Sequence, residues 1–151
     1  MDVVERFLAH AVALERDAAR RFEDLSAAMN TDGNRELHRF FARMAHYSRK
    51  HLAEASARAG FRDLPPLAPH EFEWPDGMSP ETADWEGVDA QMGAREALEL
   101  ALISERRGHA FYAGIAATTP DQELRAIAGT FAEEEAEHVA QLEKLLAACP
   151  A

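Results

Sequence analysis

FAEEEAEHVAQL, residues 131–142, combines a helical pattern with two polar residues at unexpected positions. The stretch is expected to form a helix whose apolar face includes Phe131 and Leu142. Between them, helical spacing places Glu135 and His138 on the same face, one turn apart. A carboxylate and an imidazole therefore occupy positions where a helix normally presents hydrophobic side chains to a core.

Periodicity and turn residues predict three further long helices in the chain of 151 residues. The first three helices are expected at about 2–29, 34–59 and 89–117. The fourth helix is expected to begin at TTPDQEL (118–124) and to end at about residue 149. In TTPDQEL, Thr119 is expected to cap the helix and Pro120 to take its first position, with Gln122 closing a capping box.

The segment at about 61–88 contains several prolines and is too long to be a simple turn. The short turns on either side predict two antiparallel helix hairpins, and the long segment then crosses the bundle between them. We therefore expect an all-α protein, a four-helix bundle with one long crossover, in which residues 1–151 form a single domain.

The core-facing stripe of each predicted helix is apolar or small except near its middle. In each predicted hairpin, the polar positions of the two helices lie at similar distances from the turn that joins the helices. With a rise of about 1.5 Å per residue, these distances agree to within about 3 Å. The polar groups therefore should occupy one layer across the bundle. They are Glu15, Ser48 with His51, Glu105, and Glu135 with His138.

Such a layer requires a source of positive charge. An unpaired buried carboxylate costs several kcal/mol or takes up a proton, and no Lys or Arg falls on the stripes there. A divalent metal ion, or a pair of them, would resolve the conflict. Glutamate with histidine suits iron, manganese or zinc better than calcium or magnesium. The candidate ligands are Glu15, His51, Glu105, Glu135 and His138.

Composition excludes several classes of function. The chain is 47% hydrophobic and 28% charged, with a formal net charge of −11 that argues against nucleic acid as a partner. No apolar run is long enough for a membrane span, and the N-terminus does not resemble a secretory signal, so a cytoplasmic location is expected. The single cysteine, Cys149, excludes an internal disulfide and any CxxC metal site.

The sequence resembles the rubrerythrin branch of the ferritin-like superfamily over nearly its whole length. The resemblance rests on ALERDAARRF (13–22), ALELALISERRGHAFY (97–112) and FAEEEAEHVAQLEKLL (131–146). It implies a carboxylate-bridged di-iron centre that oxidises ferrous iron or reduces peroxide or dioxygen, commonly in a homodimer. It further implies that Glu15 and Glu105 are terminal carboxylates, that His51 and His138 each ligate one metal, and that Glu135 bridges the two.

Three features depart from the pattern of this family. Ser48 stands where a second bridging Glu belongs. Either water, hydroxide or a neighbouring side chain such as Glu54 fills the gap, or the site holds one metal ion well and the second poorly. Gly108 replaces an additional Glu, and the following His109 is either a polar residue at the bundle flank or a further ligand. The chain has no rubredoxin-like module, so a peroxidase of this kind would need electrons from an external donor protein.

Three functions remain open at this level, and no side chain is assigned a catalytic role. The first is a di-iron oxidoreductase. The second is a bundle that holds a single iron, zinc or manganese ion for storage, delivery or structure, which Ser48 favours. The third is a metal-free helical bundle that acts through its surface. Tyr112, on the third seam, is expected to pack there and donate a hydrogen bond to a ligand carboxylate.

Overall fold

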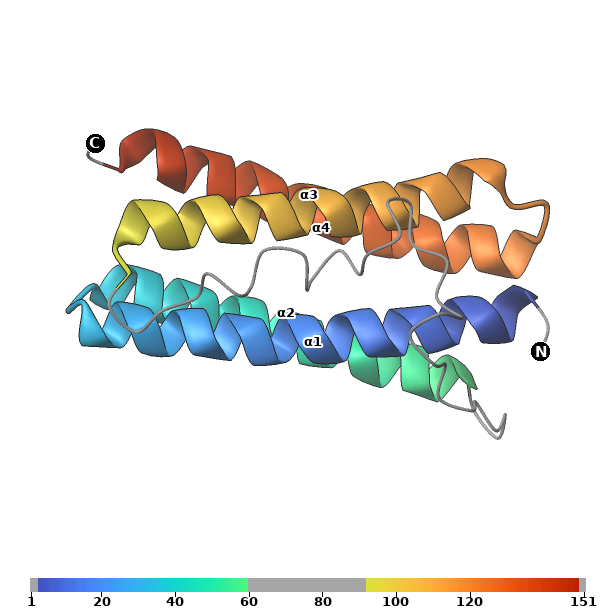
Figure 1. Cartoon of the computed structure of the whole chain (residues 1–151). Helices are drawn as coiled ribbons and strands as arrows, with labels where there is room; N and C mark the ends of the chain where they lie inside the picture. The colour runs from blue at the N-terminus through green and yellow to red at the C-terminus, as the bar shows by residue number, and fades with distance from the viewer. Residues whose placement is uncertain (1–2, 60–91, 150–151) are drawn as a thin grey trace.

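The computed structural model describes residues 3–59 and 92–149, which form a bundle of two helix hairpins. α1 packs antiparallel to α2, and α3 packs antiparallel to α4, with the second hairpin lying alongside the first (Figure 1). The all-α four-helix bundle predicted from the sequence is therefore confirmed. The helices are α1 (Val3–Thr31), α2 (Arg35–Ala59), α3 (Ala94–Thr118) and α4 (Gln122–Ala148).

The directions of α2 and α3 require a long connection between these two helices. α2 and α3 run in the same direction, so the end of α2 and the start of α3 lie at opposite ends of the bundle (Figure 1). The predicted crossover at 61–88 lies outside the described residues.

The turn between α1 and α2 is built from the residues that the sequence marks as turn formers. α1 continues to Thr31, two residues past its predicted end, since the Asp32 N–H still donates to the Ala28 carbonyl at 3.0 Å. Gly33 then adopts φ = +80°, a conformation that glycine tolerates best. The Asn34 side chain accepts a hydrogen bond from the Leu37 N–H at 3.0 Å, which caps the start of α2.

Two predicted helix starts were wrong. α3 begins at Ala94 rather than near residue 89, because Gly93 is extended at φ = −87° and ψ = 174°. α4 begins at Gln122 with Asp121, not Thr119, as its cap: the Asp121 carboxylate accepts from the Leu124 N–H at 2.9 Å. A carboxylate at this position also stabilises the positive end of the helix dipole.

Thr119 instead terminates α3. Its N–H donates to the carbonyl of Ile115 at 3.0 Å, and its hydroxyl accepts from the Asp121 N–H at 3.2 Å. Thr119 thus belongs to the turn that connects the two helices of the second hairpin.

The interior contains two hydrophobic clusters, one toward each end of the bundle. All four helices contribute to both, and fully buried aromatic residues anchor each cluster. The stretch of each helix that lies between the clusters carries the polar positions singled out above. The first cluster includes Phe22, Phe41, Met44, Leu98 and Leu142; the second includes Leu8, Leu14, Phe111, Leu124 and Phe131.

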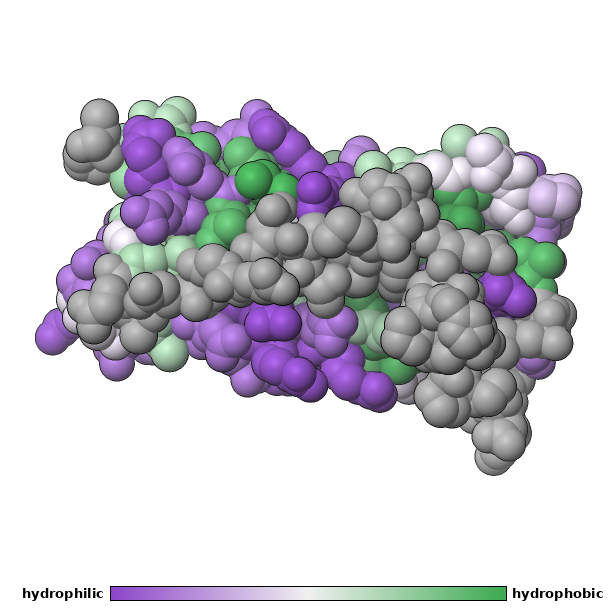
Figure 2. All heavy atoms as spheres, viewed as in Figure 1, coloured by the Kyte–Doolittle hydropathy of each residue, from purple (hydrophilic) through white to green (hydrophobic). Residues whose placement is uncertain are grey.

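The outer surface is largely hydrophilic. Figure 2 shows hydrophilic side chains gathered over the α1–α2 hairpin in the middle of the bundle. None of the four helices that the structure describes combines the length and apolar character needed to cross a membrane.

Candidate metal centre

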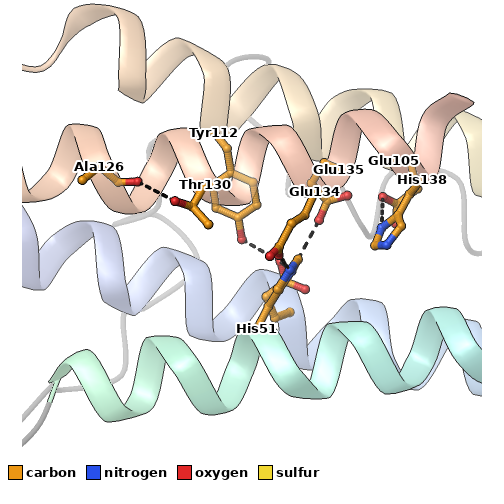
Figure 3. A network of polar contacts seen from close by, with 9 residues as sticks. His51, Glu105, Tyr112, Ala126, Thr130, Glu134, Glu135 and His138 are labelled. Atoms are coloured by element: carbon orange, nitrogen blue, oxygen red, sulfur yellow. Dashed lines mark hydrogen bonds and ion pairs between the residues drawn. The ribbon is translucent and has the colours of Figure 1, made fainter.

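Five ionisable side chains meet in the layer between the two hydrophobic clusters, and all of them are buried. Their exposed fractions range from 0% for Glu15 to 7% for His138. Figure 3 shows His51 reaching from α2 toward Glu135 on α4, with Glu105 and His138 beside each other farther along the bundle. The levels predicted from the four seams therefore coincide in space.

These residues form two groups, each of which could hold a metal ion. Glu15, His51 and Glu135 make up the first group, and Glu105, Glu135 and His138 make up the second. Within each group the ligand atoms lie within 4.8 Å of one another. Ligands about 2.0–2.2 Å from one ion are separated by up to about 4.4 Å, so small side-chain movements would suffice. Because Glu135 belongs to both groups, two ions bound there would share a carboxylate.

The first group is held by contacts from three helices. Tyr112 on α3 donates a hydrogen bond from its hydroxyl to Glu15 Oε1 at 2.8 Å, as expected from its place on the seam. His51 Nδ1 lies 3.3 Å from the same oxygen and 3.9 Å from Glu135 Oε1. The His51 ring also stacks on Phe131, with 4.8 Å between ring centroids. These contacts point His51 Nδ1 at both carboxylates.

The second group is held by different contacts. His138 Nδ1 lies 3.5 Å from Glu105 Oε2. The ring of Tyr47 also lies near His138, with 5.2 Å between ring centroids and an angle of 47° between the ring planes. The two groups are therefore similar in their ligands but differ in the side chains that orient them.

The layer contains buried carboxylate oxygens that make no hydrogen bond in the part of the chain that the structure describes. Glu15 Oε2 and Glu135 Oε2 are both buried and without a hydrogen-bond partner. A buried oxygen left in this state costs roughly 1–3 kcal/mol, and more when it is charged. The donor set and these open oxygens fit a cation of the iron, manganese or zinc type.

The electrostatics of the metal-free layer reflect the same crowding of carboxylates. Burial alone would lower the pKa of His51, but its hydrogen bond to Glu15 and the charges of Glu15, Glu135 and Glu134 outweigh burial and raise the pKa to about 9. Burial and the neighbouring Glu105 hold the pKa of Glu135 well above its usual value. The pKa of His138 is lowered, mainly by burial. Without metal, the layer therefore retains protons at neutral pH.

This protonation predicts that metal binding releases protons and becomes tighter as the pH rises. A metal ligand must be deprotonated, and His51, with a pKa of about 9, is protonated at pH 7 in the metal-free protein. Affinity should increase about tenfold per pH unit for each displaced proton, up to about pH 9. Calorimetric titration with Zn²⁺ in buffers of different ionisation enthalpy measures the number of protons released. A titration that releases none would contradict the assignment of His51 as a ligand.

Glu134 is a functional candidate that the sequence analysis missed. It lies one residue before Glu135 on α4, is only half-buried, and its Oε2 contacts His51 Nε2 across the helix interface. With the Nε2 proton donated to Glu134, the His51 Nδ1 lone pair is available to a metal. A carboxylate behind a ligand imidazole fixes its tautomer and raises its basicity.

Removing this carboxylate should weaken the first metal position. We expect Glu134→Ala to lower the affinity of one ion about 10–100-fold, since His51 loses the group that orients it. Glu134→Gln, which can still accept the hydrogen bond, should recover part of the loss. Glu133→Ala, at an exposed position of the same helix, is the matched control. Co²⁺ titrations followed by absorption spectroscopy measure these affinities, and equal curves for both alanine variants would exclude the role.

Two further candidates from the sequence lie outside both groups. Glu54 and His109 are each partly exposed, and neither joins a metal-binding group among the described residues. Ser48, by contrast, is buried, with 6% of its surface exposed, and lies one turn before His51 on the inner face of α2. The structure thus brings together Glu15, His51, Glu105, Glu135 and His138, with Ser48 at the position where the resemblance predicts a sixth ligand.

Comparison with known proteins places the chain in a family. No protein-family model matches the sequence, and neither does any curated protein. A solved structure does match: the crystal structure of an uncharacterized conserved protein from Magnetospirillum magnetotacticum MS-1. The two sequences are 34% identical, and the match covers 100% of this chain and 97% of the other, with a TM-score of 0.81. The chain belongs to the same family as this protein, a ferritin-like family.

Proposed function

We propose that this chain binds two divalent metal ions in its polar layer and, with iron bound, acts as an oxidoreductase on ferrous iron, peroxide or dioxygen. The observation that carries the proposal is the position of Glu135, which two ligand groups share while one of its oxygens has no hydrogen-bond partner. Bound iron would supply the electron-transfer chemistry that the side chains themselves lack.

The protein would supply the ligands, their orientation and the exclusion of water. Tyr112 holds Glu15 by a hydrogen bond, and Glu134 and Phe131 orient the ring of His51. The hydrophobic clusters on both sides of the layer keep bulk water away from the charged groups, which strengthens their electrostatic interactions. The acidic chain, with a net charge of −11, also favours the approach of cations such as ferrous iron.

The second candidate is a bundle that holds one metal ion tightly, without catalysis. The buried Ser48 favours it, since a serine hydroxyl is a poor ligand and leaves the pair of positions with one bridging carboxylate rather than two. In this case iron, zinc or manganese would serve a structural, storage or delivery role.

An anaerobic titration of chelator-stripped protein with ferrous iron distinguishes the two candidates. The expected result is two ions bound per chain, followed by rapid oxidation when air or peroxide is added. One bound ion without oxidation would support the single-metal candidate. No bound ion, for iron and for zinc alike, would overturn both and leave a metal-free bundle.

A further inference from the structure

α2 carries an unusual charge for this chain. Its sequence contains six Lys or Arg residues and two Glu, which makes it clearly basic, whereas the whole chain has a net charge of −11. Five of its basic side chains, including one histidine, follow one another at spacings of three or four residues and are all exposed. These residues, here called the basic stripe, are Arg35, Arg39, Arg43, His46 and Lys50.

The basic stripe lies on the side of α2 opposite the core. Helical spacing places it across the helix from the buried Phe41, Met44 and Ser48, and it extends about 22 Å at 1.5 Å per residue. Among the ion pairs that the structure describes, none includes Arg39 or Lys50. The stripe is therefore a row of positive charge that faces solvent rather than a set of structural salt bridges.

Tyr47 connects the flank of the basic stripe to the candidate metal centre. It is one of the few large hydrophobic side chains exposed on the described surface, with 44% of its area accessible. One neighbour of its ring is the exposed His46 of the stripe, at 6.2 Å between centroids, and another is the buried His138, at 5.2 Å. A molecule that docks on the stripe can thus touch an aromatic ring in direct contact with a candidate ligand.

We infer that the basic stripe, with Tyr47 at its flank, is the docking surface for a small acidic electron-transfer protein. The inference rests on the proposed function, because reduction of peroxide at bound iron requires a supply of electrons. Clustered positive charge on an otherwise acidic molecule steers an acidic partner to this one face and repels it elsewhere. The overall charge of −11 opposes a long polyanion such as nucleic acid, which would also meet the acidic surfaces.

The electron balance defines the partner. Reduction of one peroxide to two waters consumes two electrons and two protons. A one-electron carrier, such as a reduced iron–sulfur protein, must therefore be oxidised twice for each peroxide. Repeated short encounters are typical of small charged interfaces, whose association is fast and sensitive to salt.

Binding can be tested apart from activity with an acidic [2Fe–2S] ferredoxin as the probe. Calorimetry with the metal-free chain should show binding at about 20 mM salt that weakens at least tenfold by about 300 mM. The double variant Arg39→Glu/Arg43→Glu should also bind at least tenfold more weakly. Arg16→Glu/Arg20→Glu, which reverses two exposed arginines of α1 at the same spacing, is the matched control and should bind like the unmodified chain.

A second measurement tests the contribution of Tyr47. Tyr47→Ala should retain ferredoxin binding but slow the oxidation of reduced ferredoxin by the iron-loaded, peroxide-treated protein, followed anaerobically by stopped flow.

Equal loss of binding in both double variants would overturn the docking surface, as would stripe-dependent binding of a single-stranded RNA without binding of ferredoxin. Ferredoxin that docks on the stripe but delivers no electrons to iron-loaded protein would instead count against the oxidoreductase. Iron that cycles with peroxide and dithionite in a chain that does not bind ferredoxin would overturn the docking inference alone.

Discussion

Replacement of Glu135 by leucine should abolish the binding of at least one metal ion and weaken the other at least about 100-fold. Glu135 is the residue that both ligand groups share, so its removal leaves each position with one carboxylate and one imidazole. Losing a group that only supports a ligand costs about 10–100-fold, and loss of the ligand itself should cost more. Anaerobic titration with ferrous iron or Co²⁺ gives the stoichiometry and both affinities.

The same replacement should stabilise the metal-free protein at neutral pH. The folded-state pKa of Glu135 is raised, so this carboxyl destabilises the fold at any pH above its unfolded value of about 4.3. Its removal should therefore raise the free energy of unfolding by about 1–2 kcal/mol at pH 7 and by little at pH 4. Urea denaturation of chelator-treated protein at the two pH values measures the difference.

Glu133→Leu is the control for both effects. It lies on the exposed side of α4, two residues from Glu135. This variant should change neither metal stoichiometry nor the pH dependence of stability. If Glu135→Leu still binds two ions with unchanged affinity, the shared carboxylate is not a ligand and the proposed centre is wrong.

Replacement of Ser48 by glutamate should tighten the binding of the second metal ion at least tenfold. Ser48 is buried on the inner face of α2, one turn before His51. Glu and His have the same spacing in Glu135 and His138 on α4, so the new carboxylate would supply a second bridging group. It would also add one negative charge to a site in which three carboxylates would otherwise balance two divalent ions.

The same substitution should lower the stability of the metal-free protein. A fourth carboxylate in the layer would destabilise the metal-free protein, and the difference in melting temperature between metal-bound and metal-free forms should widen. Ser56→Glu, at an exposed position of the same helix, is the control and should leave both forms unchanged. A second ion that binds no more tightly in Ser48→Glu would mean that position 48 does not face the centre.

The sequence was sufficient to predict the bundle and the polar layer because both depend on helical periodicity. Glu15, His51, Glu105 and Glu135 each interrupt a regular apolar stripe, and counting from the turns placed them at one level. These arguments use only the rise and the angle per residue of a regular helix. The same regularity predicted that Tyr112 would reach a carboxylate of the layer, which its hydrogen bond to Glu15 confirms.

Features that depend on side-chain reach or local backbone geometry could not be predicted in this way. Glu134 is about 100° around the helix from Glu135, so helical periodicity predicts that it faces solvent. Its contact with His51 depends on how closely α2 approaches α4. Similarly, both Thr119 and Asp121 are good capping residues, and the backbone of the turn decides that Asp121 caps α4. Glu54 and His109 likewise stay partly exposed, and neither joins a metal-binding group among the described residues.

The polar layer also divides the interior into two separate cores. The cluster around Phe41 and Leu98 and the cluster around Phe111 and Leu124 lie on opposite sides of it. Substitutions in one cluster therefore change few contacts of the other, and effects of distant, independent sites are usually additive. Over evolution, each end of the bundle can consequently accept its own series of core substitutions, while the residues between them would be constrained by the geometry of the candidate metal centre. Variation among members of the family should therefore be greater at the two ends than at the middle of every helix.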